Sequence, residues 1–220
     1  MSEELKLALA EGISALGLSL GQEAQKQLLD YMALIQKWNK VYNLTALRDP
    51  QEILTHHLLD SLSAIGPLIQ QTRSLDGAFS FLDVGSGGGL PGVVIAICCP
   101  GVKVTCVDAV SKKAAFVQQV AASLKLGNLK GIHARVETLS GPFDVIGSRA
   151  FASLPDFVNW SSGALADGGV WMAMKGKLPE EEMSALPPTA QVFHVEQLLV
   201  PGLNAERCMV WMKKSTALSA

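Results

Sequence analysis

The feature that most constrains the fold is a glycine-rich segment, residues 83–92 (DVGSGGGLPG), which directly follows a short apolar run. Glycines at positions 85, 87 and 89 let the backbone turn sharply and approach a ligand closely. The run before the segment is typical of a buried strand, and the residues from about Pro91 are typical of a helix. Open α/β sheets bind ligands at the carboxyl ends of their strands. The segment therefore predicts an α/β fold with a small-molecule site at this loop.

Short apolar runs alternate with helical patterns throughout the second part of the chain. We expect strands at 79–84, 102–107, 131–134, 143–147 and 169–174, and helices at about 91–99, 112–126 and 154–165. In the middle helix, Ser111 is expected to cap the start and Gly127 to end it. This alternation predicts a parallel sheet covered on both faces. Residues 191–200 and 206–213 are joined by a Pro201-Gly202 turn without a helix, so these two strands are expected to be antiparallel.

The first part of the chain has a different pattern. Residues 1–75 are predicted to form an N-terminal helical extension packed on the core, and residues 76–220 the α/β domain. Ser19 and Gln22 have the spacing of a capping box ahead of a long amphipathic helix that reaches Tyr42. A second helix is predicted to begin with Asp49 as its cap and Pro50 in its first turn. With 220 residues, of which 49% are hydrophobic, the chain is long enough to bury a sizeable core.

The spacing of the glycines distinguishes between classes of ligand. A dinucleotide-binding fingerprint requires a glycine at the sixth position counted from Gly85, but that position is Leu90. The pattern D-x-G-x-G-x-G instead resembles the S-adenosylmethionine motif of class I methyltransferases, a Rossmann-like fold whose mostly parallel sheet also ends in an antiparallel hairpin. In that motif the carboxylate before the glycines, here Asp83, faces the amino-acid end of the cofactor. Asp108, at the end of the next predicted strand, is placed to accept the ribose hydroxyls.

The residues after the fourth predicted strand bear on the methyl acceptor. Segment 143–151 contains neither the Asn/Asp-Pro-Pro-aromatic loop that holds an exocyclic amine nor a cysteine nucleophile for C5 of a pyrimidine. An acceptor atom with a free lone pair and no proton to lose, such as guanine N7, needs neither group. For such an acceptor, positioning in line with the sulfonium methyl would carry most of the catalysis.

Several motifs taken together resemble the bacterial RsmG (GidB) family of 16S ribosomal RNA guanine-N7 methyltransferases. The resemblance runs from about Leu28 to Lys213 and rests on Tyr42-Asn43-Leu44-Thr45, Arg48-Asp49-Pro50, His57-Leu58-Leu59-Asp60-Ser61, Leu82-Asp83-Val84-Gly85-Ser86-Gly87, Leu90-Pro91-Gly92, Ser148-Arg149-Ala150, Pro201-Gly202-Leu203 and Glu206-Arg207. It implies methyl transfer from S-adenosylmethionine to a guanine in the decoding-region loop of the small ribosomal subunit. Carried over by position, the cofactor contacts of the family fall on Gly85, Leu90, Val136, Glu137 and Arg149, to which the motif reading adds Asp83, Gly87 and Asp108.

The charge is nearly balanced overall but unevenly distributed. The net charge is −2, with −3 over residues 1–80, from six Lys and Arg against nine Asp and Glu, and +3 over residues 81–149, from seven against four. RNA binding needs local cations, so we expect a positive face around the cofactor mouth. Its candidate RNA-binding residues are Lys37, Lys40, Arg48, His57, Lys175 and Arg207. Arg149, the one candidate for direct catalysis, could hold the cofactor or face the RNA, and His57 could equally be a core histidine.

Other classes of protein fit the sequence less well. A nicotinamide-dependent oxidoreductase is disfavoured by Leu90 and by the lack of a Tyr-x-x-x-Lys relay. A non-enzymatic assembly factor that binds S-adenosylmethionine, and a methyltransferase with another acceptor, stay open as alternatives. The four cysteines lack zinc-ligand spacing and are interpreted as reduced core thiols, so no metal is expected. Without a signal peptide or membrane-length apolar run, we expect a cytoplasmic monomer whose partner is 16S rRNA.

Overall fold

The strands form one sheet across the middle of the molecule. The structure, a computed structural model, describes residues 2–215. Its seven-stranded sheet has the order β3-β2-β1-β4-β5-β7-β6. The pairs from β3 to β5 are parallel, and β7 pairs antiparallel with both β5 and β6. The strand bounds are β1 (Ser80–Val84), β2 (Lys103–Asp108), β3 (Leu129–His133), β4 (Phe143–Arg149), β5 (Leu165–Lys175), β6 (Ala190–Gln197) and β7 (Cys208–Lys214). The mostly parallel sheet with a C-terminal antiparallel hairpin is confirmed.

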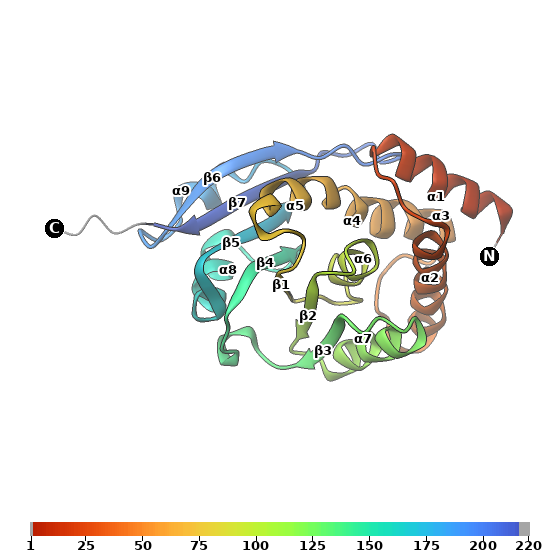
Figure 1. Ribbon diagram of the computed structural model, residues 1–220, viewed down its shortest axis with the longest axis horizontal. Coiled ribbons are helices and arrows are strands. Elements are labelled where there is room, and N and C mark those ends of the chain that lie inside the picture. The colour runs from red at the N-terminus through yellow and green to blue at the C-terminus, as the bar shows by residue number, and fades with distance from the viewer. Residues whose placement is uncertain (1, 216–220) are drawn as a thin grey trace.

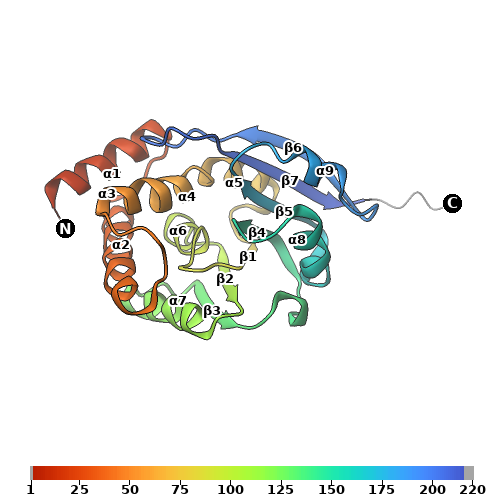
Figure 2. The same cartoon turned by 180° about the vertical axis from the view of Figure 1, so that it is seen from behind.

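Helices cover both faces of this sheet (Figure 1). Helices α6 and α7 lie on one face together with the N-terminal helices, and α8 lies on the other (Figures 1 and 2). The helices are α1 (Glu3–Ala15), α2 (Gln22–Tyr42), α3 (Pro50–Ile53), α4 (Asp60–Leu62), α5 (Ile65–Gln71), α6 (Gly92–Cys98), α7 (Ser111–Ser123), α8 (Leu154–Ser161) and α9 (Glu180–Ser184). Between α3 and α4 the chain continues as a π-helix, η1 (Leu54–Leu59), and short 3₁₀ turns lie at Arg73–Leu75, Val136–Thr138 and Ser162–Ala164.

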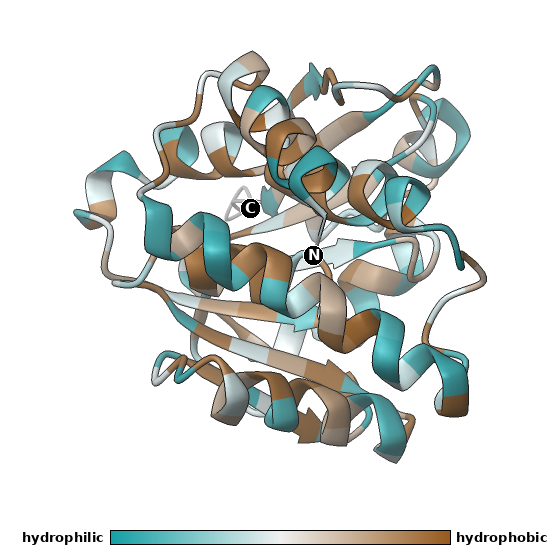
Figure 3. Ribbon diagram, turned by 90° about the vertical axis from the view of Figure 1, so that its right-hand side faces the viewer, coloured by the Kyte–Doolittle hydropathy of each residue, from teal (hydrophilic) through white to brown (hydrophobic). Residues whose placement is uncertain are grey.

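The N-terminal helices share one hydrophobic core with the sheet face that they cover. This core joins buried side chains of α1 and α2, such as Leu9 and Ile35, to Val93 of α6 and Phe116 of α7. Apolar and polar residues alternate along the helix ribbons on this side, as expected for helices with one buried face (Figure 3). A second core lies on the other sheet face, where Phe157 of α8 is buried. The extension is thus packed directly against the helices that flank the glycine-rich loop.

Helix ends differ from the sequence prediction at three places. The long helix begins at Gln22 with Gly21 as its cap, so the expected capping box at Ser19 is wrong. Helix α7 starts at Ser111 itself, because Val110 is the extended residue before it. Beyond α7 the chain reverses at Lys125, which adopts a left-handed conformation with φ 56°, so Gly127 does not end the helix. In each case a residue one or two positions away has the backbone conformation that was expected at a residue with a stronger local preference.

The predictions for Asp49 and for the Pro201-Gly202 turn are confirmed. Asp49 caps α3, since its carboxylate accepts hydrogen bonds from the N–H groups of Gln51 and Glu52. Gly202 has φ 76° in the turn before β7. The four cysteines are free thiols. No helix within residues 2–215 combines the length and apolar content that crossing a bilayer requires.

Candidate functional site

Two neighbouring cavities open at the carboxyl edge of the parallel strands. The larger, about 450 Å³, lies beyond the ends of β1, β2 and β4, and the smaller, about 220 Å³, lies between the glycine-rich loop and the N-terminal region. Gly85, Lys113 and Ala150 line both, so the two cavities adjoin. A continuous site of this size falls within the range that small ligands and cofactors occupy in proteins.

The glycine-rich loop adopts backbone conformations that need glycine. Gly85, Gly87 and Gly89 all have positive φ, at 65°, 58° and 87°. A β-carbon at Gly85 would come within 2.0 Å of the Phe151 ring, so the loop and the segment after β4 touch at this point. A β-carbon at Gly88 would meet nothing within 4 Å, which leaves the loop open toward the smaller cavity.

Asp83, in β1, binds the backbone at the end of this loop. Its side chain is fully buried, and Oδ2 accepts a hydrogen bond of 2.7 Å from the N–H of Gly92 at the start of α6. Its other oxygen, Oδ1, has no hydrogen-bond partner. Burial is the main cause that raises the pKa of this carboxyl group to about 7. Asp83 lines neither cavity, which differs from the expectation that its carboxylate faces the cofactor. In this structure its Oδ2 accepts from the Gly92 N–H and, at 3.9 Å, from the Cys106 thiol.

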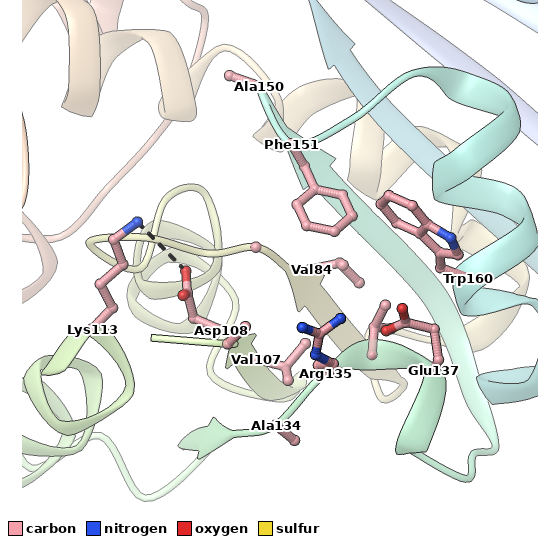
Figure 4. A pocket seen from close by; sticks show the side chains of 13 residues that line it. Val84, Val107, Asp108, Lys113, Ala134, Arg135, Glu137, Ala150, Phe151 and Trp160 are labelled. Carbon is pink, nitrogen blue, oxygen red and sulfur yellow. Dashed lines mark ion pairs between the residues drawn. The ribbon is translucent and has the colours of Figure 1, made fainter. Parts of the chain in front are cut away.

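Asp108 lies at the end of β2 and lines the larger cavity. Its Oδ2 accepts from the N–H of Gly87 at 2.9 Å, and its Oδ1 accepts from the N–H of Val110 at 2.8 Å. Lys113 approaches to 3.9 Å as an ion pair (Figure 4). A carboxylate offers about four acceptor positions, so two backbone bonds leave room for ribose hydroxyls. The same bonds fix the carboxylate and the glycine-rich loop relative to each other.

The rest of the larger cavity has an apolar wall with two further charged side chains, Arg135 and Glu137. Val136 is buried in its wall and Glu137 is exposed beside it, so the two residues that the resemblance assigned to cofactor contact both line this cavity. The rings of Phe151 and Trp160 lie 5.9 Å apart, edge to face, across the cavity from Asp108 (Figure 4). The sequence interpretation did not single out either ring. Phe151 directly follows the motif Ser148-Arg149-Ala150, and this position was the one sequence feature that could have marked it as a site residue.

The smaller cavity brings the N-terminal region to the glycine-rich loop. Gly87 and Leu90 line it from the loop, and Thr45 and His57 from the segment 43–59. His57 Nε2 lies 2.7 Å from Thr45 Oγ1, and its Nδ1 lies 3.1 Å from the carbonyl oxygen of His56. Burial, with a smaller contribution from the nearby Arg149 charge, lowers the pKa of His57 to about 4. His57 is therefore neutral at pH 7, so it lines the cavity as a polar side chain and does not contribute a positive charge for RNA.

Arg149 lines this cavity from the end of β4. Its Nη1 donates to the His56 carbonyl at 3.0 Å and to Asp60 Oδ2 at 2.7 Å. The other oxygen of Asp60 accepts from Nε of Arg207 at 2.8 Å. Asp60 is 2% exposed, so this carboxylate is buried between two guanidinium groups. The structure thus joins two predicted site residues through an acidic residue that the sequence interpretation did not select.

The remaining candidate cations have different surroundings. Lys175 donates to Glu182 and to the Ala152 carbonyl, both at 2.8 Å, so its charge is already paired. Arg48 donates to the backbone carbonyl of Asn39 and to the side-chain oxygen of Asn43. Lys37 and Lys40 are exposed on α2, and no ion pair within the described residues involves them. Within residues 2–215 no cluster of three or more His, Cys, Asp or Glu side chains has metal-ligand geometry.

Comparison with known sequences identifies the family. The GidB family profile, described as rRNA small subunit methyltransferase G, matches residues 24–210. The ribosomal RNA small subunit methyltransferase G of Paracidovorax citrulli (strain AAC00-1) is 62% identical, and the match covers 96% of this chain and 91% of that protein. The protein of the same name from Acidovorax sp. (strain JS42) is 65% identical, with 94% of each chain covered.

Two solved structures share the fold at low sequence identity. TrmN from Thermus thermophilus gives a TM-score of 0.53 at 19% identity, covering 70% of this chain and 53% of that one. The cyclase SpnF gives a TM-score of 0.54 at 12% identity, covering 70% of this chain and 81% of that one. Because a protein named as a cyclase has this fold, the fold alone does not fix the reaction. The family match, which spans most of the sequence, is the stronger evidence, and by it the chain belongs to the GidB family of rRNA small subunit methyltransferase G proteins.

Proposed function

We propose that this protein transfers a methyl group from S-adenosylmethionine to N7 of a guanine in 16S rRNA of the small ribosomal subunit. The observation that carries the proposal is the pair of adjoining cavities at the glycine-rich loop, in a chain of the small-subunit rRNA methyltransferase family. The family match supports the methyl transfer to rRNA. The choice of S-adenosylmethionine and of guanine N7 rests on the loop pattern, the missing acceptor motifs and the resemblance to the RsmG family.

The larger cavity fits the adenosyl part of this cofactor. Asp108 offers acceptor positions for the ribose hydroxyls, and the buried Val136 beside Glu137 forms a wall for the adenine. The open backbone at Gly87 and Gly88 then borders the methionine end in the adjoining smaller cavity. When bound, the cofactor supplies an electrophilic methyl group on its sulfonium.

The residues of the chain act by positioning rather than by proton transfer. Guanine N7 attacks with a lone pair and loses no proton, so a general base is not required. His57 suits such a site because it is neutral, and both of its ring nitrogens already have hydrogen-bond partners. Arg149, close to His57, orients a bound group in the same cavity. We propose that residues 1–75 belong to the catalytic unit, since Thr45 and His57 form part of its wall.

We propose that RNA binds along α2 and the start of α7. Lys37 and Lys40 are exposed on α2. Lys112 Nζ lies 5.4 Å from the ring centroid of Tyr42, whose side chain is 41% exposed. Lysine charges beside an exposed aromatic ring suit a single-stranded nucleic acid, because the cations pair with phosphate and the ring can stack on a base. An rRNA substrate implies that the protein acts in the cytoplasm.

The test uses labelled S-adenosylmethionine and small ribosomal subunits from a strain that lacks this protein. We expect one labelled guanine in 16S rRNA, with the label retained as 7-methylguanosine after nucleoside digestion. Asp108→Ala should abolish labelling by weakening cofactor binding, whereas Asp144→Asn, at the opposite edge of the sheet, should retain it. Label at another atom contradicts the N7 assignment. Cofactor binding without any label on rRNA favours the non-enzymatic assembly factor instead.

A further inference from the structure

Asp60 occupies an unusual place between the N-terminal region and the methyltransferase core. It begins α4 directly after the π-helical turn η1, and its side chain is 2% exposed. Arg149, from the end of β4, and Arg207, which precedes β7, reach it from elements 89 and 147 residues away along the chain. One buried carboxylate therefore holds together three segments that meet beside the smaller cavity.

The geometry divides the carboxylate evenly between the two arginines. Oδ2 is 2.7 Å from Nη1 of Arg149, and Oδ1 is 2.8 Å from Nε of Arg207. A buried ion pair contributes little net stability because desolvation offsets the attraction, but removing one partner leaves a buried charge without compensation. Two guanidinium groups with only one carboxylate between them would repel each other if that carboxylate were lost. The position of Arg149 therefore depends on the charge of Asp60.

The smaller cavity makes this dependence relevant to the site. Lys113 and Arg149 line it, and no carboxylate of the described residues does. His57, beside Arg149, is neutral. No lining residue therefore balances the positive charge of Arg149. The acidic group that pairs with this guanidinium is Asp60, which does not line the cavity.

We propose that Asp60 is a positioning residue that holds Arg149 in place for cofactor binding. One carboxylate oxygen of Asp60 accepts a hydrogen bond from the guanidinium of Arg149, and the other accepts one from Arg207. The inference rests on the proposed function, because Arg149 matters in this way only if the smaller cavity holds the methionine end of S-adenosylmethionine. Asp60 itself touches no ligand in this scheme. Its effect passes through Arg149.

The test is a set of charge-matched variants. Asp60→Asn leaves one acceptor oxygen for two guanidinium groups, so we expect the Kd for S-adenosylhomocysteine, measured calorimetrically without RNA, to rise about tenfold or more. Arg207→Gln keeps the bond between Asp60 and Arg149, so its Kd should stay within about threefold of the wild-type value. The double variant Asp60→Asn with Arg207→Gln gives Arg149 sole use of the remaining oxygen, so its affinity should return to within about threefold of Arg207→Gln. KM for S-adenosylmethionine should follow Kd, with a smaller change in kcat.

A matched control separates positioning from general destabilisation. Asp144→Asn removes a half-buried carboxylate whose Oδ2 accepts from the N–H of Ser80 at the other edge of the sheet. It should lower the unfolding midpoint without changing Kd. If Asp60→Asn does not fold, the double variant carries the test: affinity close to that of Arg207→Gln supports the proposal, and a tenfold loss overturns it.

Different results would overturn the proposed function and the role of Asp60. A wild-type protein that binds no S-adenosylhomocysteine overturns the proposed function and this inference with it. Wild-type binding together with an unchanged Kd in Asp60→Asn overturns only the role of Asp60. Loss of affinity in Asp60→Asn that Arg207→Gln does not restore also overturns it, because a purely structural defect would not respond to removal of the second cation.

Discussion

The buried carboxyl group of Asp83 should make the protein less stable as the pH rises. Its pKa is raised from 3.8 to about 7, mainly by burial, although the hydrogen bond from Gly92 opposes the rise. The folded state therefore holds the proton more tightly than the unfolded chain. The stability from this proton is fully present below pH 3.8 and is lost as the pH rises through about 7. At about 1.4 kcal/mol per pKa unit the whole loss is about 4 kcal/mol, of which about 2.5 kcal/mol falls between pH 5 and pH 8.

The substitution Asp83→Asn removes this titration while keeping the shape. The new amide oxygen can accept from the Gly92 N–H, and the NH₂ group would then lie where Oδ1 has no partner, at a cost of about 1–3 kcal/mol. The gain of about 4 kcal/mol from losing the charge exceeds this cost, so the variant should be about 1–3 kcal/mol more stable than the wild type at pH 8. At pH 5 most of that advantage should disappear.

Urea unfolding at pH 5 and pH 8, followed by tryptophan fluorescence, measures both differences, since Trp171 and Trp211 are buried. Asp144→Asn is the matched control and should keep the wild-type decline with pH. A decline of equal size in Asp83→Asn and in the wild type would refute the assignment of the pH dependence to Asp83.

Three further variants test the loop and the proposed RNA-facing surface. Gly85→Ala places a β-carbon 2.0 Å from the Phe151 ring at a residue with φ 65°, so cofactor affinity should fall at least tenfold in calorimetry, by about 1.4 kcal/mol. Tyr31→Phe removes a 2.5 Å hydrogen bond to a glycine-loop carbonyl, so the free energy of unfolding should fall by about 1 kcal/mol in urea titrations, and an unchanged midpoint would count against that bond. Replacing Lys37 and Lys40 together by Ala should weaken binding to single-stranded 16S fragments and reduce the slope of log K against log salt by about 1.4, at about 0.7 per lost phosphate contact, whereas an unchanged slope would place the RNA elsewhere.

The sheet was predictable from the sequence because its signal is local. Buried parallel strands need continuous apolar runs, and each run that predicted a strand contributes one to the sheet. Helix ends were less predictable. The residue that caps a helix depends on the direction from which the chain enters the first turn. Gly21 therefore caps the long helix, although the Ser19 hydroxyl is the better hydrogen-bond acceptor for a cap. Lys125 likewise takes the left-handed conformation two residues before the glycine that tolerates it best.

The site was predictable where its residues belong to one short motif or to the end of one strand. Asp108 and Glu137 line the larger cavity because strands in a parallel sheet end at the same edge. The contacts that hold the site together join distant segments and leave no local pattern. Asp60 lies 89 residues from Arg149 in sequence, and neither residue predicts the other.

These pairings also change how the charge distribution bears on RNA binding. A count along the sequence treats each lysine and arginine as available to phosphate, but Asp60 holds Arg149 and Arg207, and Glu182 holds Lys175. Of these cations Arg149 lines the smaller cavity, and all three cost more to redirect than unpaired ones, because breaking each pair leaves a carboxylate without its partner. Under the proposed function, the cations that can meet RNA at little cost are then exposed lysines such as Lys37, Lys40 and Lys112, none of which lines the smaller cavity. With few phosphate contacts, the protein can have a net charge of −2 and still bind and release its substrate, since each contact adds affinity for any RNA as well as for the correct site.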